Sequence, residues 1–321
     1  MDLKDRQGLC REAADTLAQT PHHRKLTLIW SAAAGGMGLL SSLFGLLLST
    51  GIAGTGGLAG MGTRSVLSTA QSALMLFTAI AMPFWEIGYN ASALQMSRTG
   101  QARLDTLPEG FRRFGPVLRF VLLQGLVYFG VGLLCIQFGS ILISMTPFAR
   151  ALAEKMMPLV EAMQSGDAAQ ADPAVLEAVI KAAIPVMVLY AVLMMVLYVP
   201  VFYRLRMSVF RLMDEPQCGA VQAMMSSVRM MRGKCVSLFL LDLRFWWFYL
   251  AEIAILLLCY ADVLLPMAGV SLPMSEQTAA FVCYIGSTAI QVALYTFTRN
   301  TVFVTYAKAY DRLRPKTHSK L

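Results

Sequence analysis

Residues 226–252, SSVRMMRGKCVSLFLLDLRFWWFYLAE, decide the fold of this chain, because a basic amphipathic segment there leads into an aromatic cluster and then into an apolar run. Tryptophans are enriched where a membrane span meets water. Trp246 and Trp247 therefore place the start of the hydrocarbon core, and CVSLFLLDLR before them is expected to lie at the interface. We interpret the stretch as an elbow, in which a surface helix turns into the bilayer.

The composition generalises this interpretation to the whole chain. Of its 321 residues, 57% are hydrophobic and 14% are charged, whereas a soluble chain carries about 25% charged residues. Apolar runs of about 20 residues recur, the length that crosses a bilayer as a helix, and they lack the period-2 alternation of a barrel strand. The sequence therefore predicts an all-α, polytopic membrane protein. Its six transmembrane spans are expected at about 26–48, 69–89, 117–143, 182–202, 245–265 and 279–297.

These spans lie in a transmembrane domain at 26–310, between an N-terminal segment at 1–25 and a basic tail at 311–321. The small residues at 32–38 are expected to let another helix approach the first span closely. Residues 51–62, GIAGTGGLAGMG, are expected to be a flexible connector. Amphipathic interfacial helices are expected in the N-terminal segment and in the connectors, at 11–19, about 107–118, about 152–163 and 221–231.

The distribution of basic residues predicts the orientation. Only four of the 27 Lys and Arg residues lie on the first, third and fifth connectors, namely Arg64, Arg150, Lys155 and Lys181. Cytoplasmic loops carry the excess of positive charge. Both termini are therefore expected in the cytoplasm, with the chain passing six times through the cytoplasmic membrane.

An internal repeat is a further expectation. Residues 83–114 and 200–231 both run from the end of an apolar span to the end of a basic amphipathic segment, at a constant offset of 117 positions. At this offset Arg112 corresponds to Arg229 and Leu107 to Met224. The N-terminal segment with the first two spans forms a weaker third copy, so the architecture would be a repeat of a surface helix plus a helical hairpin.

Charged groups within spans are costly in a bilayer and are therefore the candidates for function or for specific packing. Glu252 lies inside the tryptophan belt, Glu86 lies near one end of the second span, and Arg244 and Arg299 lie close to span ends. One interpretation is an ion pair that fixes helix packing, joining Glu252 or Glu86 to Arg244 or Arg299. Two others are a substrate or proton pathway and side chains that reach the headgroups.

The sequence contains no pattern of a catalytic, cofactor or metal site. No nucleophile motif, phosphate-binding loop or paired metal ligands occur, and the six cysteines form no CxxC pair. We therefore expect no enzymatic activity, no cofactor and no metal. The positive charge flanks the spans, which argues against nucleic acid and favours anionic lipid headgroups as partners. The candidate headgroup contacts are Arg112, Arg113, Arg229, Arg232 and Lys234.

Four stretches resemble the bacterial integral-membrane family catalogued as domain of unknown function 975, which is common in Firmicutes. They are PFWEIGYNASALQMSR from residue 83, FRRFGPVLRF from 111, SSVRMMRGKCVSLFLLDLRFWW from 226 and VFVTYAKAYDRL from 302. Pro83 and Gly88 resemble the family's first conserved element, and Gly233 and Lys234 belong to the second. Arg244 stands where the family usually has a small polar residue. The resemblance implies a multi-span membrane protein and supplies no activity.

Two functions remain open from the sequence. The first is a non-enzymatic membrane protein that acts in membrane or envelope organisation, or as the subunit of a membrane protein partner, through its basic inner helices. The second is a small-molecule or lipid permease with a polar path near Glu86 and Glu252. They differ in whether those two acids share a water-accessible cavity or are sealed by arginine partners.

Overall fold

The long apolar runs form long α-helices, because a backbone in lipid must satisfy its own hydrogen bonds. The computed structural model describes residues 6–49, 58–164, 173–267 and 276–314, and within these ranges no strand occurs. The elements are α1 (Arg6–Gln19), α2 (His23–Ser49), α3 (Leu58–Thr99), η1 (Leu104–Thr106), α4 (Glu109–Arg112), α5 (Phe114–Ser144), α6 (Pro147–Gln164), α7 (Pro173–Leu205), α8 (Ser208–Asp214), α9 (Ala220–Met230), α10 (Cys235–Asp242), η3 (Leu243–Phe245), α11 (Trp246–Cys259), α12 (Ala261–Met267) and α13 (Glu276–Leu313).

Five stretches of helix in the described ranges are long and apolar enough to cross a membrane. They are His23–Leu48, Ser65–Thr99, Phe114–Ser144, Lys181–Asp214 and Thr278–Leu313. Few residues of their apolar windows are buried inside the protein, between 0% and 11% of each window. Exposed apolar surface on this scale matches lipid rather than water. The fold is thus that of an all-α, polytopic membrane protein.

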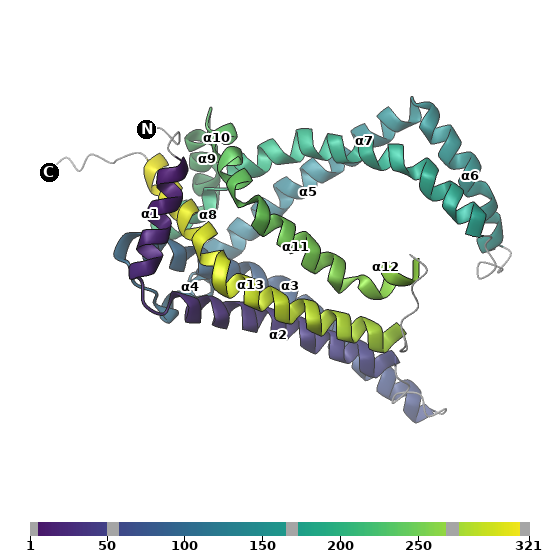
Figure 1. Ribbon diagram of the computed structural model, residues 1–321, viewed down its shortest axis with the longest axis horizontal. Helices are drawn as coiled ribbons and strands as arrows, with labels where there is room; N and C mark the ends of the chain where they lie inside the picture. The colour runs from purple at the N-terminus through teal and green to yellow at the C-terminus, as the bar shows by residue number, and fades with distance from the viewer. Residues whose placement is uncertain (1–5, 50–57, 165–172, 268–275, 315–321) are drawn as a thin grey trace. The chain divides into compact units, whose positions relative to one another are not determined.

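The predicted count of six spans is not confirmed. The fifth predicted span, 245–265, is divided at Tyr260 into α11 and α12, because the chain leaves the helical conformation there, at φ −101° and ψ 16°. With 14 residues, α11 reaches roughly 21 Å, short of the ~30 Å hydrocarbon core. Both pieces nevertheless pack along α13, as Figure 1 shows.

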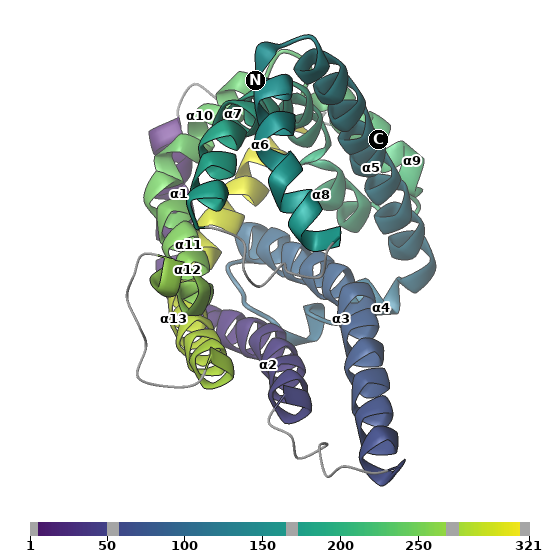
Figure 2. The ribbon, with the colours of Figure 1, turned by 90° about the vertical axis from the view of Figure 1, so that its right-hand side faces the viewer.

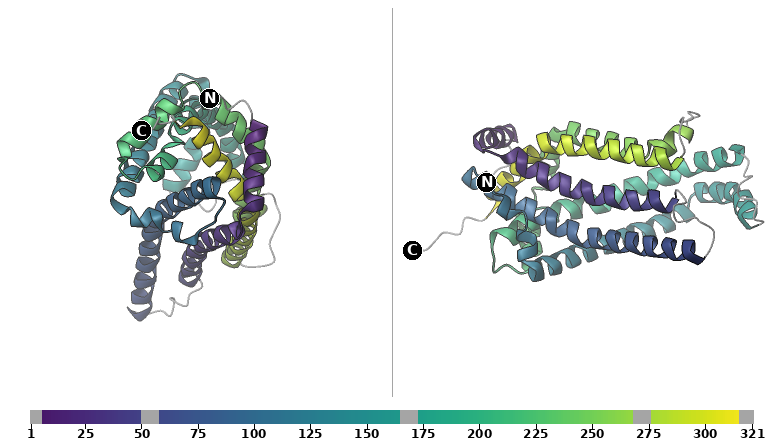
Figure 3. Two further views of the ribbon diagram at one scale, coloured as in Figure 1. Left: turned by 90° about the vertical axis from the view of Figure 1, so that its left-hand side faces the viewer. Right: turned by 90° about the horizontal axis from the view of Figure 1, so that it is seen from below.

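The chain divides into two units, residues 1–120 with 207–321 and residues 121–206. In the first unit α2 packs most extensively against α13, and the two lie side by side in Figures 2 and 3. A Cβ at Gly35 would lie 2.8 Å from Thr288 Cγ2, and one at Gly38 would lie 2.0 Å from the Tyr284 hydroxyl. The expectation that small residues at 32–38 admit a neighbouring helix is therefore confirmed.

The first unit also contains a densely packed helical assembly, which we call the helical head. It consists of α1, η1, α4, α8, α9, α10 and the C-terminal ends of α3 and α13. At 42 and 38 residues, α3 and α13 measure roughly 63 and 57 Å, about twice the hydrocarbon thickness. Their last turns can therefore extend past a membrane and join the head.

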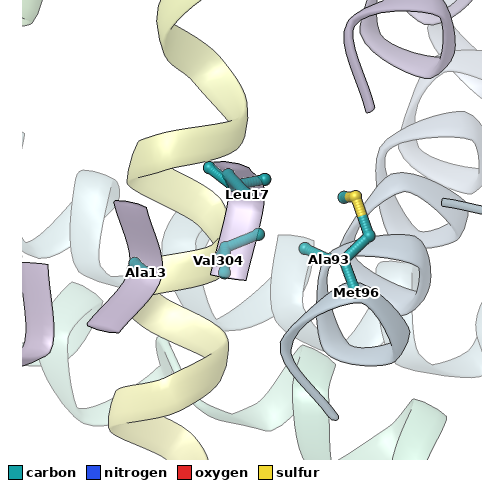
Figure 4. Packing of buried hydrophobic residues seen from close by; sticks show 5 residues of the cluster. All are labelled: Ala13, Leu17, Ala93, Met96 and Val304. Carbon is teal, nitrogen blue, oxygen red and sulfur yellow. The ribbon is translucent and has the colours of Figure 1, made fainter. Parts of the chain in front are cut away.

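The core of the head joins segments from opposite ends of the chain. Ala13 and Leu17 on α1 pack with Ala93 and Met96 on α3 and with Val304 on α13, and all five are 5% exposed or less. Figure 4 shows these side chains converging from the three helices. The N-terminal helix and the C-terminal end of α13 thus lie at the same end of this unit, where Arg312 also pairs with Glu12.

The second unit comprises the rest of α5 with α6 and α7. Tyr128 on α5 packs against Tyr198 on α7, with 5.3 Å between ring centroids. A Cβ at Gly139 would lie 2.3 Å from Tyr190 Cε1, so a glycine lets α7 approach α5 closely at this point. The amphipathic helix expected after the third span is α6, which packs on α7.

Three local expectations need correction. Residues 58–62 of the predicted flexible connector belong to α3. Residues 51–57 of that connector lie outside the described ranges. The helix expected over 107–118 is interrupted, because Arg113 takes φ −101° and ψ 44° between α4 and α5. The exposed face of α9 carries Val221, Met225 and Val228, whereas Met224, Ser227 and Met230 are buried in the head. Tertiary packing therefore divides the predicted apolar face between the core of the head and its surface.

Candidate functional site

The clearest polar site within a span is centred on Arg299, which α13 places against α2 and α3. Its Nη2 lies 2.8 Å from both carboxylate oxygens of Glu86. The guanidinium carbon also lies 3.9 Å from the ring centroid of Trp30 and 4.6 Å from those of Tyr295 and Phe303. Such short distances over ring faces are attractive, because the ring quadrupole is negative at its face. We call this group, together with Tyr89, the arginine–aromatic cluster.

Hydrogen bonds connect the helices around this cluster and hold the ring of Tyr89. The Tyr89 hydroxyl donates to Asn300 Oδ1 over 2.7 Å, and Asn300 Nδ2 donates to the His23 carbonyl over 2.8 Å. Trp85 Nε1 donates to the Trp30 carbonyl over 3.2 Å. Three helices are therefore tied together around one cation. Arg299 Nε is buried and has no hydrogen-bond partner among the described residues, so the ring faces are its main compensation.

The structure brings Glu86 and Arg299 together but not the other two candidates. Glu252 is half-buried on α11 and interacts with the hydroxyl of Tyr295, which makes it a neighbour of the cluster through that ring. Arg244 is exposed on η3 and interacts with Cys10 of α1. Asp242, which the sequence placed among the headgroups, is instead 7% exposed and accepts a hydrogen bond from the Tyr306 hydroxyl.

A second polar site, in the helical head, was missed from the sequence. The side chain of Asp214, at the end of α8, is 4% exposed and lies 2.5 Å from Arg98 Nη1. It also lies 3.0 Å from Arg314 Nη1 and accepts a hydrogen bond of 2.8 Å from Tyr310. Arg98 further donates to Asp311 through Nε, over 3.1 Å. We call this group the ionic junction.

In each of the three expected repeats a surface helix is followed by a hairpin of two long helices. The ionic junction joins residues at or just after the end of the second long helix of each repeat. Arg98 ends α3, Asp214 ends α8 just after α7, and Asp311 lies in the last turn of α13. A signal for it existed, because the repeat offset of 117 pairs Arg98 with Glu215, the neighbour of Asp214. The secondary structure is less regular than the repeat, since positions equivalent to η1 and α4 fall within the single helix α9.

The five candidate headgroup residues lie in three different surroundings. Arg113 donates to the carbonyls of Leu212 and Pro216 over 2.8 and 3.1 Å, so its guanidinium binds the C-terminal end of α8. Arg112 is exposed and lies 3.6 Å from Glu109. The other three, Arg229, Arg232 and Lys234, line one cavity of the head together with Arg211.

These features define a class of protein, a polytopic helical membrane protein with a packed polar head at one end of its long helices. Within the described residues, no group of His, Cys, Asp and Glu side chains is placed to hold a metal ion. The family described as "Protein of unknown function (DUF975)" matches residues 39–300, and the chain belongs to that family. No curated protein and no solved structure matches the chain.

Proposed function

We propose that this chain is a non-enzymatic membrane protein that acts in membrane or envelope organisation, or as the subunit of a membrane protein partner. The observation that supports this best is the arginine–aromatic cluster. Glu86 is paired with Arg299, and the guanidinium is enclosed by aromatic rings. A neutralised acid on tightly packed helices suits a fixed structural contact better than a path that must bind and release a substrate.

In this proposal the helical head is the part of the protein that contacts the partners. It projects the polar ends of α3 and α13, gathers the basic segments, and lies at the end of the unit that holds both α1 and the C-terminus of α13. We place this end in the cytoplasm of a bacterial cell, because the basic connectors and both terminal segments belong to it. Anionic headgroups of the inner leaflet are then its nearest partners.

Reconstitution tests this proposal against the permease. Purified protein in liposomes is exposed to a labelled pool of small metabolites, with empty liposomes and the Glu86→Gln variant alongside. We expect no uptake above empty liposomes, together with a lower melting temperature for Glu86→Gln. Uptake by the wild type that disappears in Glu86→Gln, at an unchanged melting temperature, would establish a permease and refute the proposal.

A further inference from the structure

One cavity of the head is lined by residues of α8, of α9, of the turn that follows α9 and of the end of α13. Neither the arginine–aromatic cluster nor the ionic junction explains it. Its volume is about 450 Å³, within the range of ligand sites. The lining combines cationic, polar and apolar side chains, namely Arg211, Gln222, Ser226, Arg229, Met230, Arg232, Lys234 and Leu313. Four of these eight residues carry a positive charge, so the cavity suits an anion.

The charges on this cavity are only partly neutralised. Arg211 pairs with Glu215 over 2.6 Å, yet its Nε is buried without a hydrogen-bond partner among the described residues. In the same described part of the chain, Arg229, Arg232 and Lys234 form no ion pair. Like charges that converge from different elements repel one another, and a bound anion removes that repulsion.

The backbone brings these charges together in a defined way. Arg211 comes from α8, whereas Arg229 lies in the last turn of α9. Gly233 then takes a φ of +73°, which turns the chain between α9 and α10. Lys234 follows this turn and lies at the N-terminal end of α10. Basic side chains in a last helical turn are also favourable for the helix dipole. That effect applies to Arg211 at the end of α8 and to Arg229 at the end of α9, but it does not account for their meeting Arg232 and Lys234 at one cavity.

We propose that this cavity binds a phosphate-bearing anion. Guanidinium groups bind phosphate oxygens through paired hydrogen bonds, and a lysine adds a point charge. The amide of Gln222 adds a neutral donor at the same cavity. The inference deepens the proposed membrane role by giving the head a ligand, and only its lipid form rests on that role.

Two sources could supply such a phosphate, a lipid headgroup or a soluble phosphorylated metabolite. The surface beside the cavity favours the lipid. Val221, Met225 and Val228 form an exposed apolar stripe on α9, with exposed fractions of 63%, 54% and 36%. They occur at the i, i+4 and i+7 positions of one helix face, next to the face that carries Arg229. A headgroup in the cavity would leave its acyl chains beside this stripe.

The test uses the full-length protein in detergent. Native mass spectrometry measures the binding of phosphatidylglycerol and of phosphatidylcholine, and calorimetry measures the binding of glycerol 3-phosphate and inorganic phosphate. The pocket variant is Arg229→Gln/Arg232→Gln/Lys234→Gln, which spares Arg211 and its ion pair. Arg103→Gln is the matched control, because Arg103 is an exposed arginine outside the cavity and is not one of the candidate headgroup contacts.

We expect phosphatidylglycerol to bind at least tenfold more tightly than phosphatidylcholine. We also expect the pocket variant to lose at least tenfold in this binding, while Arg103→Gln stays within twofold. Binding of glycerol 3-phosphate, lost in the pocket variant, would support the soluble source instead. The proposal is overturned if neither phosphatidylglycerol nor glycerol 3-phosphate binds. It is also overturned if the pocket and control variants bind alike at unchanged melting temperatures. Uptake in the liposome assay would refute the non-transport role and leave this site intact.

Discussion

Gly88 on α3 lies directly against the carbonyl oxygen of Leu107, so that a Cβ at residue 88 would fall 1.8 Å from that oxygen. A second contact of the same kind runs in the opposite direction, from the segment after α3 back to α3. A Cβ at Gly110 would fall 2.1 Å from the carbonyl oxygen of Phe84. Two glycines thus let α3 and the segment with η1 and α4 touch through their backbones. Gly88 also belongs to the stretch that resembles the family's first conserved element, and this contact gives a physical reason for a glycine there.

Gly88→Ala should therefore destabilise the head. The obstacle is a backbone carbonyl rather than a movable side chain, so one helix must shift, at a cost of about 1–3 kcal/mol or more. We expect a lower melting temperature and a lower yield of monodisperse protein in detergent, measured by heating followed by size-exclusion chromatography. Gly115→Ala is the control, because nothing lies within 4 Å of the added Cβ. Equal behaviour of the two variants would contradict this account.

Asp214→Asn should weaken the ionic junction. The carboxylate is nearly buried and interacts with Arg98, Arg314 and Tyr310, and a hydrogen bond to a charged group contributes about 1.5–3 kcal/mol. We expect a loss of about 2 kcal/mol in thermal or denaturant unfolding. The matched control is Asp105→Asn, since Asp105 pairs with Arg103 at the surface and both side chains are at least half exposed. Its loss should stay below about 1 kcal/mol.

The pair of Glu86 and Arg299 should be coupled in a double-mutant cycle. Each single variant, Glu86→Gln or Arg299→Gln, leaves one charged partner without its counter-ion. The double variant should then be less destabilised than the sum of the two, with a coupling energy of about 1 kcal/mol. Melting temperatures of the four proteins in one detergent supply the measurement. Additive losses would mean that the two charges do not stabilise the fold through each other.

The two termini should lie on the same side of the membrane. Glu12 and Arg312 form an ion pair, and α11 with α12 packs along the spanning helix α13, so six crossings are expected although α11 alone is short. Fluorescent-protein fusions at both termini should be bright in a bacterial host, and an alkaline phosphatase fusion after Ala168 should be active. Opposite results for the two termini would require an odd number of crossings.

The stretch around Gly233 shows which structural features a sequence pattern can predict and which it cannot. Residues 226–252 form α9, α10, η3 and α11, with a turn at Gly233 that glycine signals locally. Where this stretch enters the bilayer stays a prediction. The predicted apolar face of α9 is divided, because Met224 is buried in the head whereas Val221, Met225 and Val228 are exposed. Amphipathic spacing identifies an apolar stripe, but it does not say whether that stripe meets lipid or the core of a head.

By itself, the sequence determined that this protein is helical, that it spans a membrane, and where most of its spans lie. Hydrophobic length and charge placement are properties of short segments, and the bilayer acts on each segment separately. Only the tertiary structure decided that Arg299 meets Glu86, that Arg98 meets Asp311 across 213 positions, and that 245–265 breaks at Tyr260. Those outcomes depend on which helices pack together, and many pairings of charged span residues are compatible with one hydrophobic pattern.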